Sequence, residues 1–446
     1  MADEFDGALL RRGDPGYEVA RRAAMWNALV PDRFPDAVVQ AASEEDAVRA
    51  VRLARDEGLR IAVRSGGHSW AGNHVRDGGL LLDVSRLDEV TVDPAARTAT
   101  VGPGRAGTEL LELLAEHDLF FPAGHCVGVC VGGYLLQGGF GWNGRVHGPA
   151  CQSVEAIDVV TADGELVRAD ADQHPDLYWA ARGSGPGFFG VVTRFHLRCQ
   201  PKPNVVANAV YLYPLDALEE VFTWAAEIGP QVARTMELML FLHRDEAGEV
   251  EIAVTGPVLA DTDEEADEVL AILESCPARA RAKLELPNLR VTMADLFAGS
   301  HAVYPDDHRY AVDNMWTHAP IADLLPGLRA IAESLPPAPS HFLWMNWDPL
   351  GPGSAEREDM AFSVEDTTYL ALYAVWDDPA RDAERIAWAT GHMRAMAPHA
   401  SGIQLADENL GRRPARFITD EKMRRLDAIR GDYDPEERFH PWMGRL

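Results

Sequence analysis

The stretch RSGGHSWAGN, residues 64–73, follows the apolar run LRIAV and precedes GGLLLDVSRL. Two adjacent glycines directly after an apolar run predict a sharp strand-to-loop turn, because glycine adopts backbone angles that other residues avoid. His68 stands at this turn. Its residue type and position leave three roles open: an ordinary loop histidine, a metal ligand, or the attachment point of a larger group.

The segments on either side of this turn indicate the fold class. Residues 37–63 predict a strand, a helix and a second strand, because Ser43 suits a helix N-cap and Gly58 stands where a helix commonly ends. After residue 80 the chain changes to short β-branched runs broken by Asp-Pro, Gly-Pro-Gly and Asp-Gly turns. This pattern favours an α+β assembly of sheets over a doubly wound parallel sheet.

The length of 446 residues favours two domains with separate cores. The segment CQPKPNV, residues 199–205, contains two prolines and leads into a new series of strands, so we predict a domain boundary there. The pattern of the tail after residue 402 fits either a third element or a return to the first domain.

Composition restricts the partners. The net charge is -29, from 41 Lys and Arg against 70 Asp and Glu, which disfavours nucleic acid and anionic membrane surfaces as partners. The acidic residues are dispersed, which is typical of a solvated surface. No run approaches the roughly 18 apolar residues of a membrane span, and the first residues are acidic and lack the apolar core of a signal peptide. Five cysteines do not make a disulfide framework in so long a chain, and we expect a soluble, cytoplasmic protein.

Two further glycine clusters follow the first: PAGHCVGVCVGGYLLQGGFGW at 122–142 and RGSGPGFFGVVTRF at 182–195. Dense glycine is expected where backbone approaches a large, flat ligand, and consecutive N–H groups in such turns suit a pyrophosphate. None of the clusters matches the nicotinamide dinucleotide pattern. One alternative is that they form only tight turns of a β-rich domain. Another is a zinc site made by Cys126, Cys130, His147 and Cys151, whose spacing is loose for structural zinc.

These clusters, with VVTADGELVRA, DLYWAARGSGPGFFGVVT and the late YDPEERFH, resemble the berberine-bridge-enzyme-like branch of the vanillyl-alcohol-oxidase flavoproteins. The resemblance covers about residues 33–198 and the tail from 416. It implies a two-part, PCMH-type FAD-binding domain at residues 1–202, an antiparallel-sheet substrate domain flanked by helices at 203–402, and a return to the first domain at 403–446.

The resemblance also implies how FAD is held. In the family, the histidine of R-S-G-G-H bonds the 8α-methyl carbon of the flavin, and a cysteine after A-G-x bonds C6 in the bicovalent members; the matching positions are His68 and Cys126. Neutral imidazole and thiolate are suitable nucleophiles for this. Val129 matches a position where valine is compatible with oxygen reaching the flavin, while Cys130 stands where glycine is usual. The residues expected to contact FAD are Arg64, Ser65, Gly66, Gly67, His68, Ser69, Cys126, Gly128, Val129, Gly132, Gly133, Tyr134, Gly138, Gly139, Gly141, Trp142, Gly190, Val191 and Val192.

The reacting groups are expected in the second domain. In TTYLALYAVW, alternation places Tyr369, Ala371 and Tyr373 on one face of a strand. Relatives tend to carry Glu or Gln where Ala371 stands, and their Tyr-x-Asn is replaced by GIQLADENL, so the usual base is in doubt. We predict Tyr369 or Tyr373 as the base, provided that its pKa is lowered, with Asn346 and His243 as further pocket residues.

The resemblance therefore implies a covalent FAD oxidase that takes a hydride from an alcohol or amine carbon of a small natural product or sugar and releases hydrogen peroxide. The expected partners are a small-molecule substrate and molecular oxygen, in a monomer or homodimer, with no metal. Alternatives are a dehydrogenase with another acceptor, a flavin-loaded binding protein without a base, and a zinc-stabilised binding module without flavin.

Overall fold

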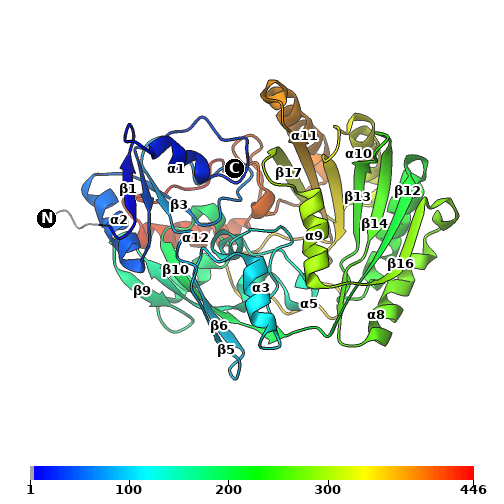
Figure 1. Ribbon diagram of the computed structural model, residues 1–446, viewed down its shortest axis with the longest axis horizontal. Coiled ribbons are helices and arrows are strands. Elements are labelled where there is room, and N and C mark those ends of the chain that lie inside the picture. The colour runs from blue at the N-terminus through cyan, green and yellow to red at the C-terminus, as the bar shows by residue number, and fades with distance from the viewer. Residues whose placement is uncertain (1–4, 446) are drawn as a thin grey trace.

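The computed structural model describes residues 5–445 and consists of two lobes joined side by side (Figure 1). Residues 1–4 and 446, the outer ends of the domain ranges predicted above, lie outside the described residues. The first lobe carries the early part of the chain and the C-terminal helix, and the second carries one large sheet (Figure 1).

The first lobe begins with a small mixed sheet of strand order β1-β2-β4-β3, made of β1 (Ala8–Arg11), β2 (Ala37–Gln40), β4 (Leu80–Asp83) and β3 (Ile61–Arg64). Helix α1 (Tyr17–Ala23) and helix α2 (Glu44–Asp56) belong to this part. The Ser43 side chain caps α2 by accepting a bond from the Asp46 N–H, and Gly58 beyond its end has φ +68°. The predicted strand, helix and strand of residues 37–63 are thus confirmed.

A second, antiparallel sheet of this lobe has the strand order β5-β6-β10-β8-β9. Its members are β5 (Val90–Asp93), β6 (Thr98–Val101), β10 (Val191–Arg198), β8 (Val154–Val160) and β9 (Leu166–Ala169). A short ribbon pairs β7 (Leu119–Phe120) with β11 (Gln200–Pro201), and the helices between are α3 (Gly107–Ala115), α4 (Val131–Leu136), α5 (Gly144–His147) and α6 (Pro175–Ala181).

The second lobe is built on an eight-stranded antiparallel sheet of order β15-β12-β14-β13-β18-β19-β17, with β16 also paired to β12. The strands are β12 (Val205–Pro214), β13 (Met239–Arg244), β14 (Val250–Thr255), β15 (Val258–Ala260), β16 (Leu284–Arg290), β17 (Arg309–Thr317), β18 (His341–Asn346) and β19 (Thr368–Trp376). The helices are α7 (Leu218–Ile228), α8 (Asp263–Leu270), α9 (Met293–Val303), α10 (Ile321–Ser334) and α11 (Asp382–Met396).

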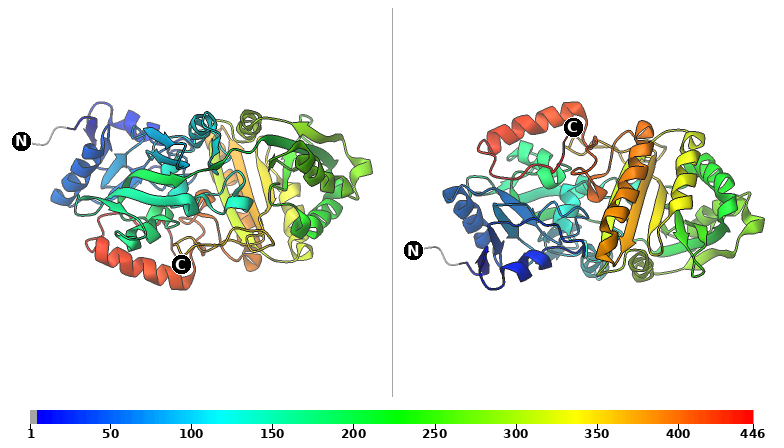
Figure 2. Two further views of the ribbon diagram at one scale, coloured as in Figure 1. Left: turned by 90° about the horizontal axis from the view of Figure 1, so that it is seen from below. Right: turned by 90° about the horizontal axis from the view of Figure 1, so that it is seen from above.

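Strand alternation divides this sheet into two faces. Leu240, Phe342 and Leu372 on one face share a core with side chains of α7, α10 and α11, such as Phe222 and Leu328. Figure 2 shows α11 lying across the sheet on this side. The opposite face of the sheet is therefore not covered by these helices and is turned toward the first lobe.

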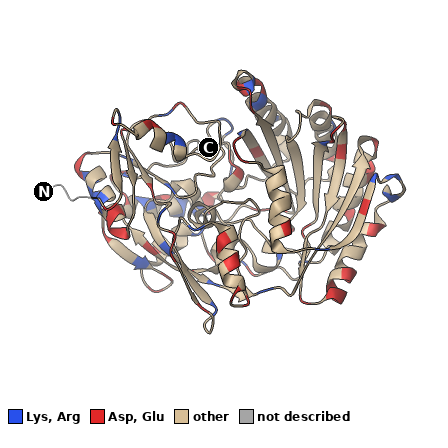
Figure 3. Ribbon diagram, viewed as in Figure 1, with Lys and Arg blue, Asp and Glu red and all other residues tan. Residues whose placement is uncertain are grey.

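The tail crosses back to the first lobe. Helix α12 (Asp420–Tyr433) packs against α6, and the His440 N–H donates to the carbonyl of Ile61 at 2.9 Å. Together the sheets and helices make an α+β fold, as the sequence predicts. Asp and Glu are distributed over both lobes (Figure 3), and none of the helices within residues 5–445 combines the length and apolar character needed to cross a membrane.

Candidate active site

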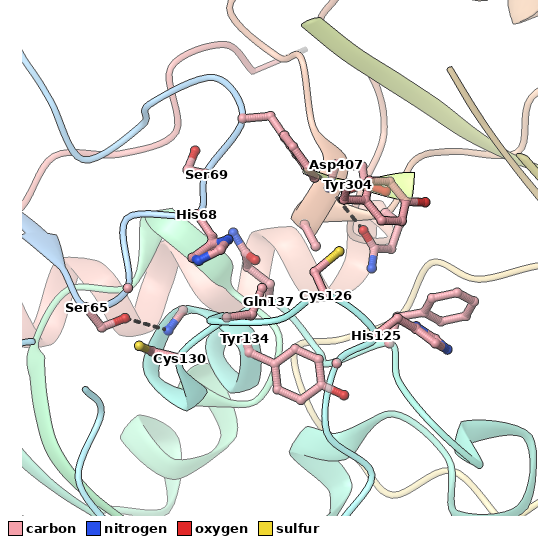
Figure 4. Close-up of a pocket in the computed structure, with 18 of the residues that line it drawn as sticks. Ser65, His68, Ser69, His125, Cys126, Cys130, Tyr134, Gln137, Tyr304 and Asp407 are labelled. Atoms are coloured by element: carbon pink, nitrogen blue, oxygen red, sulfur yellow. Dashed lines mark hydrogen bonds between the residues drawn. The ribbon is translucent and has the colours of Figure 1, made fainter. Parts of the chain in front are cut away.

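A cavity of about 610 Å³ lies between the lobes. From the first lobe it is lined by parts of residues 61–76, 124–142 and 185–192, and from the second by the free face of the large sheet. The segment 404–407 and residues 439–440 complete the lining (Figure 4). The volume is in the range typical of ligand and cofactor sites.

His68 enters the cavity from the turn after β3. Gly67 makes that turn with φ +73°, and a Cβ at this position would lie 2.2 Å from the carbonyl oxygen of Ala24, so only glycine fits. The His68 ring stacks on Trp26 with centroids 4.9 Å apart. Burial lowers the pKa of His68 to about 4, so its imidazole is neutral near pH 7.

Cys126 lies on the second glycine loop, close to the Asp407 side of the cavity (Figure 4). Burial, with a smaller effect from the negative charge of Asp407, raises the pKa of its thiol. The thiolate that sequence reasoning assigns to this position is therefore disfavoured by the protein alone. Cys130 also lines the cavity, where its thiol donates to the carbonyl of Gly104 at 3.0 Å and has a pKa raised to about 11.

The cysteine loop is held against the second lobe by a buried carboxylate. His125 lines the cavity, and its Nε2 lies 2.8 Å from Glu237 Oε2. The other oxygen of Glu237, a residue only 1% exposed, accepts the N–H of Asn143 at 2.8 Å. These contacts of Glu237 join the two lobes and fix His125, the residue next to Cys126. The role of Glu237 cannot be identified from the sequence.

The lining fits FAD on chemical grounds. The Ser65 and Ser69 hydroxyls and the Arg76 guanidinium suit phosphate and ribose, and the apolar Val84 and Phe188 suit flat rings. Among the described residues, three cavity-lining side chains also have a buried polar atom without a protein partner: Asn73 Oδ1, Trp142 Nε1 and His440 Nε2. Buried polar atoms normally find partners, so this cavity suits a ligand with many hydrogen-bonding groups.

Asp407 lies at the centre of the reacting end. Its Oδ2 accepts bonds from the hydroxyls of Tyr369 and Tyr373, the latter at 2.6 Å, and its Oδ1 accepts the indole N–H of Trp70 at 2.6 Å. All four side chains line the cavity. Asp407 lies within GIQLADENL, residues 402–410, and its residue type alone does not predict a role for it. The only available signal is an acidic residue in the segment that departs from the family pattern.

The environment of the two tyrosines opposes the role predicted for them. Burial and the charge of Asp407 raise the pKa of both Tyr369 and Tyr373 well above the ordinary value. A tyrosinate base needs a lowered pKa, so this condition fails because the nearest charge is negative. Both tyrosines instead remain protonated and donate to Asp407.

Asn346 does not line the cavity. Its side-chain amide donates to the carbonyl of Gly229 at 2.9 Å, and the residue is 2% exposed, which corrects its assignment as a pocket residue. His243 lies outside the lining as well, with Nε2 3.5 Å from Glu251. Both residues do lie on strands of the large sheet, as expected.

The expected FAD contacts divide into two groups. Those that line the cavity are Arg64, Ser65, Gly66, Gly67, His68, Ser69, Cys126, Val129, Gly132, Gly133, Tyr134, Trp142, Gly190 and Val192. Those that do not are Gly128, Gly138, Gly139, Gly141 and Val191. Glycines of the second group allow close packing of the loops: a Cβ on Gly138 would lie 2.5 Å from the ring of Phe362, and one on Gly141 would lie 2.2 Å from the carbonyl oxygen of Ala123. Val191 is buried in strand β10.

The four residues of the zinc alternative do not form one site. Within residues 5–445 no three His, Cys, Asp or Glu side chains are grouped so that they could hold a metal ion. Cys151 is buried with its sulfur 3.6 Å from that of Met360, and Cys130 is bonded to Gly104.

Comparison with known proteins identifies the chain. A model of the FAD binding domain matches residues 35–170. The FAD-linked oxidoreductase janO of Penicillium janthinellum is 32% identical over 429 residues, covering 95% of this chain and 94% of that protein.

Solved structures share the fold over nearly the whole chain. The 6-hydroxy-D-nicotine oxidase of Arthrobacter nicotinovorans superposes with a TM-score of 0.87 at 23% identity, covering 99% of this chain and 98% of that one. The BBE-like 1 protein of Physcomitrella patens gives 0.85 at 20% identity, covering 98% and 96%. The chain therefore belongs to the FAD-linked oxidoreductases and has the fold of these two structures.

Proposed function

We propose that this FAD-dependent oxidoreductase is an oxidase, which takes a hydride from the carbon that bears an alcohol or amine group and uses molecular oxygen as the acceptor. The observation that carries the proposal is the group formed by Asp407, Tyr369 and Tyr373 in a cavity that also contains His68 and Cys126. FAD, when bound, supplies the hydride acceptor and passes two electrons to oxygen, which gives hydrogen peroxide.

Asp407 replaces the tyrosines as the proposed base. A substrate O–H or N–H must lose its proton as the C–H bond breaks, and a carboxylate can accept that proton directly or through the hydroxyl of a bonded tyrosine. Tyr369, Tyr373 and Trp70 donate to both carboxylate oxygens, so they hold Asp407 in one orientation. This arrangement also offers a carboxylate where Ala371 lacks one, which supports an enzyme over a protein without a base.

We further propose that His68 bonds the flavin and that Cys126 forms a second bond. The lowered pKa of His68 supports this, because the neutral imidazole is the nucleophilic form. The proposed bond between Cys126 and the flavin forms less readily than the one from His68. The reason is that the pKa of the thiol is raised, and the thiol must lose its proton before it can react. The negative charge of Asp407 adds to the effect of burial on this thiol.

Asp407→Asn is the direct test. The amide keeps the size of the side chain and cannot accept a proton, so anaerobic flavin reduction by the best substrate of an alcohol and amine panel should slow about 10²–10⁴-fold. Flavin content should stay unchanged. Stopped-flow absorbance of the flavin measures the rate.

Asp382→Asn is the matched control, because Asp382 also accepts a tryptophan indole N–H, that of Trp376 at 2.8 Å, and does not line the cavity. The flavin of the Asp382→Asn variant should be reduced by the substrate at the wild-type rate. A wild-type rate for Asp407→Asn would remove Asp407 as the base. Failure of every panel member to reduce the wild-type flavin, while dithionite does reduce it, would instead favour a binding protein.

A further inference from the structure

The sheet wall of the cavity carries a continuous apolar patch next to the reacting end. Met239 on β13 lies directly opposite Met345 on β18, and Phe241 lies opposite Leu343. All four side chains line the cavity. Met345 in turn lies opposite Tyr369 on β19, so the patch begins beside the tyrosine that is bonded to Asp407.

The patch extends away from Asp407 across several strands. From β19 it crosses β18, β13 and β14 to β12, and Ala253 on β14 and Val210 on β12 also line the cavity. Four strand spacings separate β19 from β12, or about 19 Å. A substrate whose reacting carbon lies at Asp407 therefore has a long apolar surface on which to place the rest of its body.

Few polar groups are available along this wall. Thr255 and Asn208 line it, but the Thr255 hydroxyl donates to Asn208 Oδ1 at 2.8 Å, and the same oxygen accepts the N–H of Gly256 at 3.2 Å. Asp295, in the first turn of α9, caps that helix by accepting the N–H and hydroxyl of Thr292. The Thr255 hydroxyl, Asn208 Oδ1 and the Asp295 carboxylate are thus engaged within the protein.

Helix α9 borders the same part of the cavity with mostly apolar or small residues. Leu296, Gly299 and Val303 line the cavity at successive turns, with Ser300 as a polar residue between them, and Tyr304 follows just after the helix. Nothing lies within 4 Å of a Cβ built on Gly299, so there is open space beside this turn. The cavity is thus apolar on the helix side as well as on the sheet side.

From this wall we infer that the substrate is an alcohol or amine on a predominantly hydrocarbon body, and not a free sugar. The inference rests on the proposed function for the reacting group and adds the nature of the rest of the molecule. A sugar would bury several hydroxyls against Met239, Phe241 and Leu343 without new partners, which is unfavourable. A hydrocarbon body instead gains from each buried methylene, and methionine side chains adapt to its shape.

A homologous series of ligands tests the inference on the flavin-loaded protein. Binding of 1-butanol, 1-hexanol and 1-octanol is measured from the perturbation of the flavin absorbance, with glucose and xylobiose as polar ligands. Affinity should rise with chain length by up to about fourfold per methylene, and at least tenfold from butanol to octanol. The sugars should perturb the spectrum only at far higher concentration.

A polar substitution in the patch makes the test specific to this wall. Phe241→Asn should weaken octanol binding about 10-fold or more, while Phe241→Leu should stay close to wild type. Leu166→Asn is the control, because Leu166 is an exposed apolar residue of β9 in the other lobe. Should Phe241→Asn fail to fold, the chain-length series on the wild type still decides the question.

The outcomes separate the two proposals. Binding that does not depend on chain length, or sugars that bind more tightly than octanol, would overturn the hydrocarbon body. Tight binding of glucose together with reduction of the flavin by glucose would also overturn the hydrocarbon body, but it would agree with the proposed oxidase activity. Length-dependent binding without reduction by any alcohol or amine would support the apolar patch and contradict the proposed reaction.

Discussion

The two walls of the cavity differ in how they are built. The wall from the first lobe consists of loops, and its key residues stand in three short segments of the chain. The wall from the second lobe consists of alternate side chains from separate strands, such as Met239, Leu343 and Tyr369. The first wall is rich in glycine and polar groups, whereas the second is mostly apolar, with Thr255, Asn208, Tyr369 and Tyr373 as its polar residues.

This difference has a functional consequence. A loop wall can follow a cofactor closely, because its backbone groups and small residues face the ligand. A sheet wall presents side chains at fixed spacings, so its chemistry changes when single residues change. We therefore expect substitutions in the first wall to affect flavin attachment and substitutions in the second to affect the substrate step.

The largest expected effect is on attachment. The double variant His68→Ala with Cys126→Ala should contain no covalent flavin, because both proposed nucleophiles are gone. Acid precipitation followed by absorbance of the pellet measures this.

The single variants sharpen the same test. Cys126→Ala should retain attachment through His68, and His68→Ala should retain at most a fraction through Cys126, whose raised pKa disfavours the thiolate. Covalent flavin in the double variant would place the linkage elsewhere in the chain.

The next effect concerns stability and pH in the second lobe. His341 on β18 is 2% exposed and stacks on Tyr373 with centroids 4.7 Å apart, and burial lowers its pKa from 6.5 to about 4. Between these values the unfolded chain binds a proton that the folded protein does not, so the free energy of unfolding falls as pH drops from 6.5 toward 4. The contribution is about 3 kcal/mol at most.

Denaturant unfolding of wild type and His341→Gln across this pH range measures the effect. The variant should show a flatter dependence on pH, whatever its stability at pH 7. His117→Gln, at an exposed position of the first lobe, should leave the dependence unchanged. Equal slopes in wild type and His341→Gln would show that His341 does not titrate differently on unfolding.

A smaller effect is expected from the tyrosines that hold Asp407. Tyr369→Phe or Tyr373→Phe removes one hydrogen bond to a charged group, so anaerobic flavin reduction should slow about 10–100-fold, with attachment intact. The effect should be less than that of Asp407→Asn. A tyrosine variant slower than Asp407→Asn would return the role of base to that tyrosine.

The smallest effect concerns oxygen. Val129 lines the cavity from the first wall, and Val129→Leu adds one methylene there. Reoxidation of the reduced enzyme in air should slow by less than about tenfold, since one added methylene narrows a path without closing it. Substrate reduction should stay unchanged. Equal reoxidation rates would show that Val129 does not control oxygen access.

Much of the fold follows from local pattern. The strand, helix and strand expected within residues 37–63 are present as β2, α2 and β3, and the strand expected in TTYLALYAVW is present as β19. Alternation also places Tyr369 and Tyr373 on one face, and both line the cavity as expected. These features depend on neighbouring residues in the chain, so a single sequence contains the information.

The errors have a common cause. Asn346 lies on a strand next to cavity-lining residues, but its amide is taken by Gly229, 117 residues away in the chain. A tyrosine base requires a lowered pKa, and the neighbouring charge that decides the direction of the shift is the negative Asp407. The contact of Asn346 and the pKa of the tyrosines both depend on which side chain from a distant part of the chain packs next to them. Sequence periodicity does not contain this information.

The sequence by itself determined the flavin-type loops, the α+β class and the two tyrosines on one strand face, because each is encoded in contiguous residues with a fixed backbone period. Only the tertiary structure brought Asp407 to those tyrosines and to Trp70, which is 337 residues away from it in the chain. It also decided which strand faces the first lobe covers and which remains open as an apolar wall. Packing of distant segments makes these choices, since burial of apolar area is non-directional and leaves no local signal in the chain.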